Sequence, residues 1–193
     1  MKNVAYFRSI ILITLNFNRI ETDIGVIHYC EETKPTELSK RDFQTQIIQA
    51  LVKEAGYASH SIEHKPSGQP YFDGENMPNV SVSHSDNYGA IYIGKPAVGV
   101  DIQTFHPRIA AGKDYFINSN EIQFDTSLEL HLIWAAKEVI FKSLGGFIAD
   151  ARQEVTVMKI DFDTLTAHAE IGGNIRKVGF IHTQTFVLAY SLD

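Results

Sequence analysis

Hydrophobic and polar positions alternate along the chain with two periods, one typical of strands and one of helices. Apolar residues at Ser9–Leu15 and Ile24–Cys30 predict two buried strands. A helical spacing of apolar residues follows from Pro35 to Gly56. Thr36 is the expected N-cap of this helix, and Gly56 is expected to end it. The chain is therefore predicted to begin with two strands and a helix.

The next segment is rich in turn residues and then returns to strand alternation. Residues 65–79 contain three prolines and two glycines, which predicts a loop. The alternating residues of Val80–Ile93 predict a hairpin that turns at Asp86 and Asn87.

The second half of the chain shows a similar order of elements. Its strongest pattern is a helix that Gly145 and Gly146 are expected to end. The expected elements are a strand at Ala97–Gln103, a loop with a short helix at Thr104–Asp125, a helix at Ser127–Leu144, and three or four strands after Val155 with a turn at Gly172–Asn174.

The order strand, helix, hairpin thus occurs twice. Val80–His84 also matches Val178–His182 at one constant offset. We therefore expect an α+β protein with two similar halves, residues 1–97 and 98–193, that arose by duplication and form one compact unit. The alternative is chance similarity between two stretches of ordinary α+β sequence.

Composition narrows the class of protein. The 193 residues are 44% hydrophobic and 21% charged, which is typical of a globular protein. The single cysteine, Cys30, excludes a disulfide framework or a multi-cysteine zinc site and fits a cytoplasmic location. A net charge of −6 argues against nucleic acid as a partner. We read the short run Ser9–Leu15 as a strand rather than a signal peptide, and no run is long enough for a membrane span.

A carboxylate interrupts the apolar strand of the second half. Alternation places Asp101 and Gly99 on one face and Val100 and Ile102 on the other. A buried carboxylate is unfavourable unless it is paired or bound to a cation. Gly99 would let a ligand or a backbone approach closely. The alternative for Asp101 is a position at the strand end, facing water.

The strong helix carries Glu138 and Lys142 four residues apart, opposite its core stripe. The alternative is an exposed ion pair, which would contribute only about 0.2–0.5 kcal/mol. However, the helix is apolar nearly all round, so little of it should face solvent. We therefore expect Lys137, Glu138 and Lys142 to form the wall of an anion site.

A third polar cluster lies in the predicted hairpin. Alternation places the serines of Ser81–Ser85 on one face and His84 on the other, with Val80 and Val82. A lone histidine of this kind is often structural. Together, however, the three clusters offer carboxylates for a hard cation and Lys, His and Ser for phosphate oxygens. This combination suits Mg²⁺ that bridges a phosphorylated ligand.

These clusters and one loop motif resemble the 4'-phosphopantetheinyl transferase superfamily. The resemblance covers about residues 38–146 and rests on the order of four motifs: Gly68-Gln69-Pro70, Ser83-His84-Ser85, Gly99-Val100-Asp101 and Trp134 through Lys142. The length is similar to that of the surfactin-synthetase-activating type. The resemblance implies two α+β halves related by a pseudo-twofold axis, with the active site between them.

The resemblance also implies an activity: a monomer that transfers the phosphopantetheine arm of coenzyme A to a serine of an apo acyl or peptidyl carrier protein and releases 3',5'-ADP. Asp101, Glu138 and Gln103 would hold Mg²⁺, and Glu138, or a water that it orients, would take the proton from the serine. Asp101, Glu138 and Lys142 would be the catalytic residues. The residues implied to contact coenzyme A are Lys40, Arg41, Gly68, Gln69, Pro70, Ser83, His84, Lys137 and Lys142.

Gln103 departs from the family pattern, in which many two-half members have an acid at this position. We expect weaker Mg²⁺ binding as a result, rather than loss of activity. Gln103 also motivates an alternative, a non-catalytic homologue that binds coenzyme A or the carrier protein. A different Mg²⁺-dependent phosphate enzyme would need more clustered acids. The basic and apolar segment His106–Phe116, with Arg108 and Lys113, is the expected docking site for an acidic carrier protein.

Overall fold

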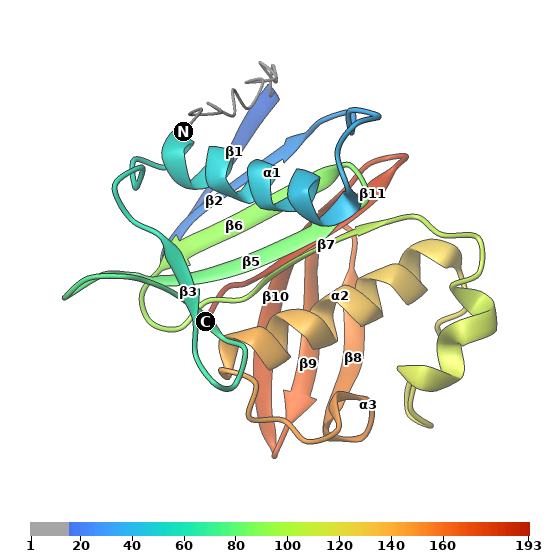
Figure 1. The fold of residues 1–193 in the computed structure, drawn as a ribbon. Helices are drawn as coiled ribbons and strands as arrows, with labels where there is room; N and C mark the ends of the chain where they lie inside the picture. The colour runs from blue at the N-terminus through green and yellow to red at the C-terminus, as the bar shows by residue number, and fades with distance from the viewer. Residues whose placement is uncertain (1–15) are drawn as a thin grey trace, which may run out of the picture.

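The computed structural model describes residues 16–193, so the strand predicted at Ser9–Leu15 lies outside the described residues. The described chain is an α+β protein with two antiparallel sheets (Figure 1). Its first half contains β1 (Asn16–Thr22), β2 (Gly25–Glu31), α1 (Lys40–Glu54), β3 (Ile62–His64), β4 (Pro70–Phe72), β5 (Asn79–Ser85) and β6 (Tyr88–Gly94). Its second half contains β7 (Val100–Thr104), the 3-10 helix η1 (Ala110–Tyr115), α2 (Ser127–Ser143), α3 (Ala151–Glu154), β8 (Val155–Asp161), β9 (Thr166–Ile171), β10 (Asn174–His182) and β11 (Phe186–Ser191).

Three adjacent strands follow the same order in both sheets: β2-β6-β5 in the first and β7-β11-β10 in the second. The first sheet has the order β1-β2-β6-β5-β4-β3 and the second has β7-β11-β10-β9-β8. In each, the strand that precedes the long helix pairs with the last strand of its half, and that last strand pairs with the strand before it. β5 and β10, which carry the matching sequences, hold equivalent positions. This shared order supports the predicted pair of halves, while their origin by duplication stays a prediction.

Both long helices begin at a side-chain cap. Ser39 caps α1 by accepting a hydrogen bond from the Asp42 N–H at 3.1 Å, so the predicted cap at Thr36 is wrong. Thr36 lies instead in a turn before the helix. Thr126 and Glu129 form a capping box on α2. Gly145, at φ +69°, follows the end of α2 as predicted.

Three strands, β1, β3 and β4, lie where the sequence predicts none. β3 and β4 make a short hairpin with Pro70 opposite His64; β4 lies within the predicted loop 65–79, and β3 directly precedes it. Proline is tolerated there because it is the first residue of its strand. β1 was missed because it is mostly exposed and has no continuous apolar face. The hairpin of β5 and β6 and the four strands after Val155 agree with the prediction.

Three hydrophobic cores hold these elements together. One lies between α1 and the first sheet, and one lies between α2 and the second sheet. The third joins the sheets and includes Val100 and Ile102 of β7. As predicted, Asp101 is on the opposite face of β7, toward α2. A Cβ at Gly99 would collide with the backbone carbonyl of Val139, so Gly99 allows the helix backbone to approach.

Serine side chains of β5 replace the missing neighbour strand of β7, and the sheets meet along this line (Figure 1). Three serine hydroxyls accept backbone N–H groups at 3.1 Å: Ser81 from Val100, Ser83 from Ile102 and Ser85 from Thr104. The edge of β7 is therefore satisfied without a strand partner. His84 is on the other face of β5, which confirms the predicted alternation.

Within residues 16–193, no helix has both the length and the apolar character that crossing a membrane would need.

Candidate functional site

Asp101 lies at the centre of a hydrogen-bonded network between the two halves. Its side chain is buried, with the residue only 3% exposed, so the alternative of a carboxylate facing water is wrong. Oδ1 accepts from Lys142 Nζ at 2.7 Å and from Ser83 Oγ at 2.8 Å. Oδ2 accepts from Gln103 Nε2 at 2.6 Å. Donors from β5, β7 and α2 thus compensate the cost of burying this charge.

Lys142 connects this network to the surface. Its Nζ also donates to the Val100 carbonyl at 3.0 Å, while the side chain remains 24% exposed. The two members of this ion pair therefore differ in exposure: the Asp101 carboxylate is buried, whereas the Lys142 side chain lines a cavity. We call it the open pair.

Glu138 is one helical turn before Lys142 and faces the same network. Burial and the nearby Asp101 carboxylate raise the pKa of Glu138, and Lys142 partly offsets this effect. Among the described residues, the Glu138 side chain has no hydrogen-bond or ion-pair partner. Two neighbouring carboxylates with one nearby lysine leave net negative charge when both are ionised, which favours a bound cation. The structure thus brings together the two acids that the sequence singled out.

A cavity of about 350 Å³ opens beside Lys142; we call it the Gly68 cavity. The Gly68–Pro70 turn forms one side, and His84 of β5 and Lys142 of α2 form others. Three of the four motifs of the resemblance therefore line one cavity. The fourth, with Asp101, lies directly behind Lys142.

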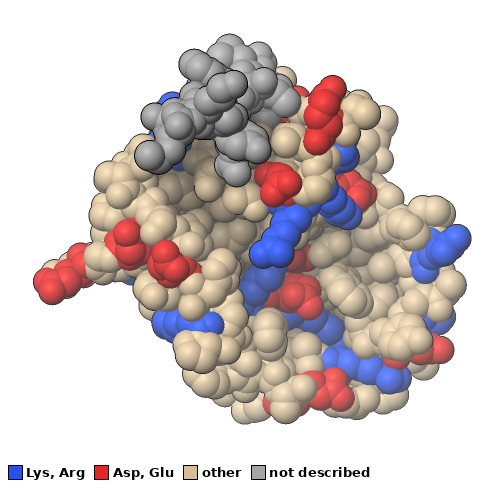
Figure 2. All heavy atoms as spheres, in the orientation of Figure 1, with Lys and Arg blue, Asp and Glu red and all other residues tan. Residues whose placement is uncertain are grey.

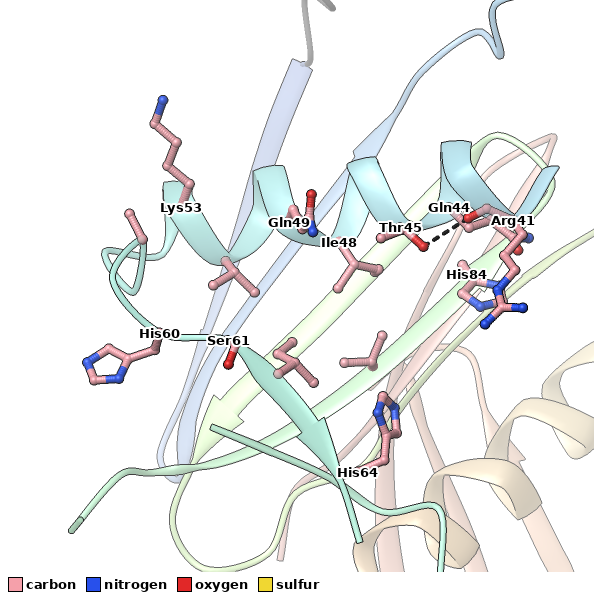
Figure 3. A pocket seen from close by; sticks show the side chains of 14 residues that line it. Arg41, Gln44, Thr45, Ile48, Gln49, Lys53, His60, Ser61, His64 and His84 are labelled. Atoms are coloured by element: carbon pink, nitrogen blue, oxygen red, sulfur yellow. Dashed lines mark hydrogen bonds between the residues drawn. The ribbon is translucent and has the colours of Figure 1, made fainter. Parts of the chain in front are cut away.

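A second cavity of about 630 Å³ runs along α1; we call it the α1 cavity. Arg41 of α1 and His84 lie at one end of it, and His60 lies at the other (Figure 3). The two cavities are adjacent, because His64, Val82 and His84 line both of them, and we call the pair the groove. Its floor is partly apolar, with Ile48 and Val82.

The structure separates the two basic residues predicted at the start of α1. Arg41 lines the α1 cavity, whereas Lys40 forms an exposed ion pair with Asp86 at 3.5 Å. Lys and Arg side chains gather on the face between α1 and α2 (Figure 2). Burial, together with the charges of Lys142 and Lys40, lowers the pKa of His84. This histidine is therefore neutral near pH 7 and would gain a proton more readily beside a bound anion.

Besides Lys40, two residues predicted to contact coenzyme A, Lys137 and Ser83, do not line the groove. Lys137 is 3% exposed and donates to Glu121 at 2.8 Å and to the Arg152 carbonyl at 3.1 Å. Five residues on a helix rotate a side chain by roughly 140°, so Lys137 and Lys142 point in different directions. Ser83 is turned toward β7 and contacts Asp101 rather than the cavity. Their expected contacts with coenzyme A have no support in this arrangement.

Some groove residues were not singled out from the sequence. His64, Ser67, Gly145 and Gly146 line the Gly68 cavity. In the sequence the two glycines indicate only the end of a helix, although a wall without side chains also leaves room for a ligand. His64 gave no signal because its strand is too short for a periodic pattern.

The donor set can be tested against Mg²⁺. Within the described part of the chain, no three His, Cys, Asp or Glu side chains gather as a ready-made metal site. Mg²⁺ is commonly held by one or two carboxylates, with waters and substrate phosphates completing the shell. Asp101 and Glu138 meet this requirement, and Gln103 adds an amide oxygen if its side chain turns. The residues therefore fit the ion, provided that a ligand supplies further oxygens.

No protein-family model matches the chain, and no curated protein matches it. Thiol chemistry is disfavoured on physical grounds, because burial raises the pKa of Cys30 to about 12.

Proposed function

We propose that this protein is a Mg²⁺-dependent 4'-phosphopantetheinyl transferase with the two-half fold of that superfamily. It moves the phosphopantetheine arm of coenzyme A to a serine of an apo carrier protein. One observation carries the proposal: four sequence motifs spread over more than 70 residues converge on one groove and one buried carboxylate network. The shared strand order of the two sheets supports the fold.

The groove offers complementary charge to coenzyme A. Arg41, His84 and Lys142 provide cationic or hydrogen-bonding groups for its phosphates. The partly apolar floor suits the adenine base, which the Gly68–Pro70 turn would border. When bound, Mg²⁺ would neutralise charge on the diphosphate, with Asp101 and Glu138 as its protein ligands.

The transfer itself requires positioning and a base. The carrier serine oxygen attacks the phosphorus that bears the pantetheine arm, and the bond from this phosphorus to the bridging oxygen breaks. 3',5'-ADP leaves with that oxygen, while Lys142 lies where it can offset the developing charge. Glu138, directly or through a water, accepts the serine proton. Burial strengthens Glu138 as a base because it raises the pKa.

The segment His106–Phe116 is the proposed docking surface for the carrier protein. It follows β7 directly, and its Arg108 and Lys113 side chains are exposed. Buried His131 fixes the start of this segment by accepting the His106 N–H at 3.0 Å. Because carrier proteins are acidic, Arg108→Glu with Lys113→Glu should raise the KM for carrier protein about tenfold and leave kcat unchanged. An unchanged KM would reject this surface.

An intact-mass assay tests the function. Apo acyl carrier protein is incubated with coenzyme A, Mg²⁺ and the protein, with chelator in a parallel sample. The expected result is a mass gain of one phosphopantetheine group that chelation prevents. A panel of fatty-acid, polyketide and peptide carriers identifies the class of carrier that the protein prefers.

Gln103 favours a second candidate, a non-catalytic homologue that binds coenzyme A or carrier protein. An amide two residues after Asp101 adds no charge for a metal and instead donates to Asp101. Calorimetric binding of coenzyme A with no transfer to any carrier in the panel would support this candidate over the enzyme.

A further inference from the structure

Both carboxylate oxygens of Asp101 accept hydrogen bonds, and the three donors differ in how easily they can move away from the carboxylate. Ser83 is fixed, because its Oγ also accepts the Ile102 N–H at 3.1 Å. Gln103 is a neighbour on the same strand, 2.6 Å away. Lys142 is the exchangeable donor: its long side chain reaches Asp101 from α2 and is partly exposed to the Gly68 cavity.

The Lys142 ammonium group binds the Asp101 oxygen that a metal cation would need as a ligand. Lys142 Nζ lies 2.7 Å from Asp101 Oδ1, and a metal ion at the same oxygen would be repelled at that distance. Glu138, which has no polar partner among the described residues, is the only other nearby carboxylate that the network offers. Without a ligand, the lysine therefore serves as the cation of this site.

We propose that Lys142 is an exchangeable internal counter-ion: it closes the Asp101–Glu138 site to a free divalent cation and opens it by moving to an anion in the Gly68 cavity. This inference rests on the proposed function, in which that anion is the diphosphate of coenzyme A. A lysine suits the role, since its ammonium is a compact charge on a flexible stem.

The exchange makes the two ligands depend on each other. An anion that takes Lys142 leaves Asp101 and Glu138 with two uncompensated charges, so the cation binds more tightly. By thermodynamic reciprocity, the cation then strengthens binding of the anion. Removing Lys142 should therefore tighten cation binding to the free protein and weaken coenzyme A binding. A lysine that only contacts phosphate would not change cation binding to the free protein.

The test titrates the full chain with Mn²⁺ alone and follows free Mn²⁺ by electron paramagnetic resonance. Lys142→Gln should bind Mn²⁺ about tenfold more tightly than wild type, within the usual range of coupling between sites. Lys159→Gln is the matched control, because Lys159 forms an exposed pair with Asp161 at 2.7 Å on β8. This control should leave Mn²⁺ affinity unchanged.

Unchanged or weaker Mn²⁺ binding in Lys142→Gln overturns the counter-ion role, as does no Mn²⁺ binding in either protein. If Lys142→Gln does not fold, Lys142→Met, which keeps the aliphatic stem, carries the same expectation. The outcome is separable from that of the proposed function. Tighter Mn²⁺ binding without any transfer would reject the enzyme and keep the counter-ion, whereas transfer without tighter binding would do the reverse.

Discussion

Two lysines of α2 each meet a buried carboxylate, yet the surroundings of the two pairs are opposite. Lys137 and Glu121 are both almost fully buried, with side chains 4% and 0% exposed. Glu121 also accepts the backbone N–H groups of Asn118 and Val157, so this pair ties two segments to α2. Lys142 and Asp101 lie beside a cavity and beside Glu138. The closed pair can only hold the fold, whereas the open pair has an alternative partner for its lysine.

Stability provides the largest expected contrast between the pairs. Lys137→Met should cost about 3–5 kcal/mol of unfolding free energy, because it leaves the Glu121 charge buried without a cation. Lys142→Met should cost less, about 1–2 kcal/mol, since Asp101 keeps Ser83 and Gln103 as donors. Urea titration of both variants measures the difference. Equal losses of unfolding free energy in the two variants would mean that the two lysines compensate their buried carboxylates to the same extent.

The proposed transfer activity should depend on the charge of Asp101 in the open pair. Asp101→Asn keeps the shape of the side chain but removes its charge, and the proposed transfer should fall about 10²–10³-fold. The assay is the intact-mass measurement with apo carrier protein, followed over time. A rate within threefold of wild type would show that Asp101 does not act in the reaction.

The groove beside the open pair should depend on Arg41. Replacing Arg41 by Gln removes a cationic wall of the α1 cavity, so coenzyme A should bind about tenfold more weakly. Arg19→Gln is a matched control, because Arg19 pairs with Glu21 on the exposed β1 strand. Calorimetry measures the coenzyme A affinity of both variants. Equal affinities for Arg41→Gln and Arg19→Gln would mean that coenzyme A does not bind beside Arg41.

The smallest expected effect is a pH-dependent gain in stability. The pKa of Glu138 is raised in the folded protein above its ordinary value of 4.5, so ionisation opposes folding as the pH rises above that value. Glu138→Gln should therefore melt at a higher temperature than wild type at pH 7–8, with the gain disappearing below about pH 4.5. A gain that persisted at acidic pH would show that desolvation of the carboxylate is not its cause.

Alternation and helical spacing were sufficient to predict most of the elements near the site. The period-2 pattern of β5 predicts the serines and His84 on opposite faces, and that of β7 predicts Asp101 on the face opposite Val100 and Ile102, as the structure shows. These predictions held because each strand is buried on at least one face. The polar strand β1 lacks such a face and could not be recognised.

The sequence could not predict contacts between residues that are distant along the chain and meet only through tertiary packing. Nothing in the sequence near Glu121 indicates that it is fully buried beneath α2, so the sequence alone favours a ligand contact for Lys137 as well as for Lys142. Helical rotation alone would have separated the two lysines, since residues five apart do not share a face. The groove along α1 could not be predicted either, because its walls come from separate elements of the first half.

A crystal structure with Mn²⁺ and coenzyme A, analysed by anomalous scattering, tests the central claim most directly. The account predicts one Mn²⁺ peak bound by the carboxylates of Asp101 and Glu138 and by the diphosphate, with Lys142 turned from Asp101 to a phosphate oxygen. A diphosphate bound away from these two carboxylates, or Lys142 still paired with Asp101 beside the occupied metal, would contradict it.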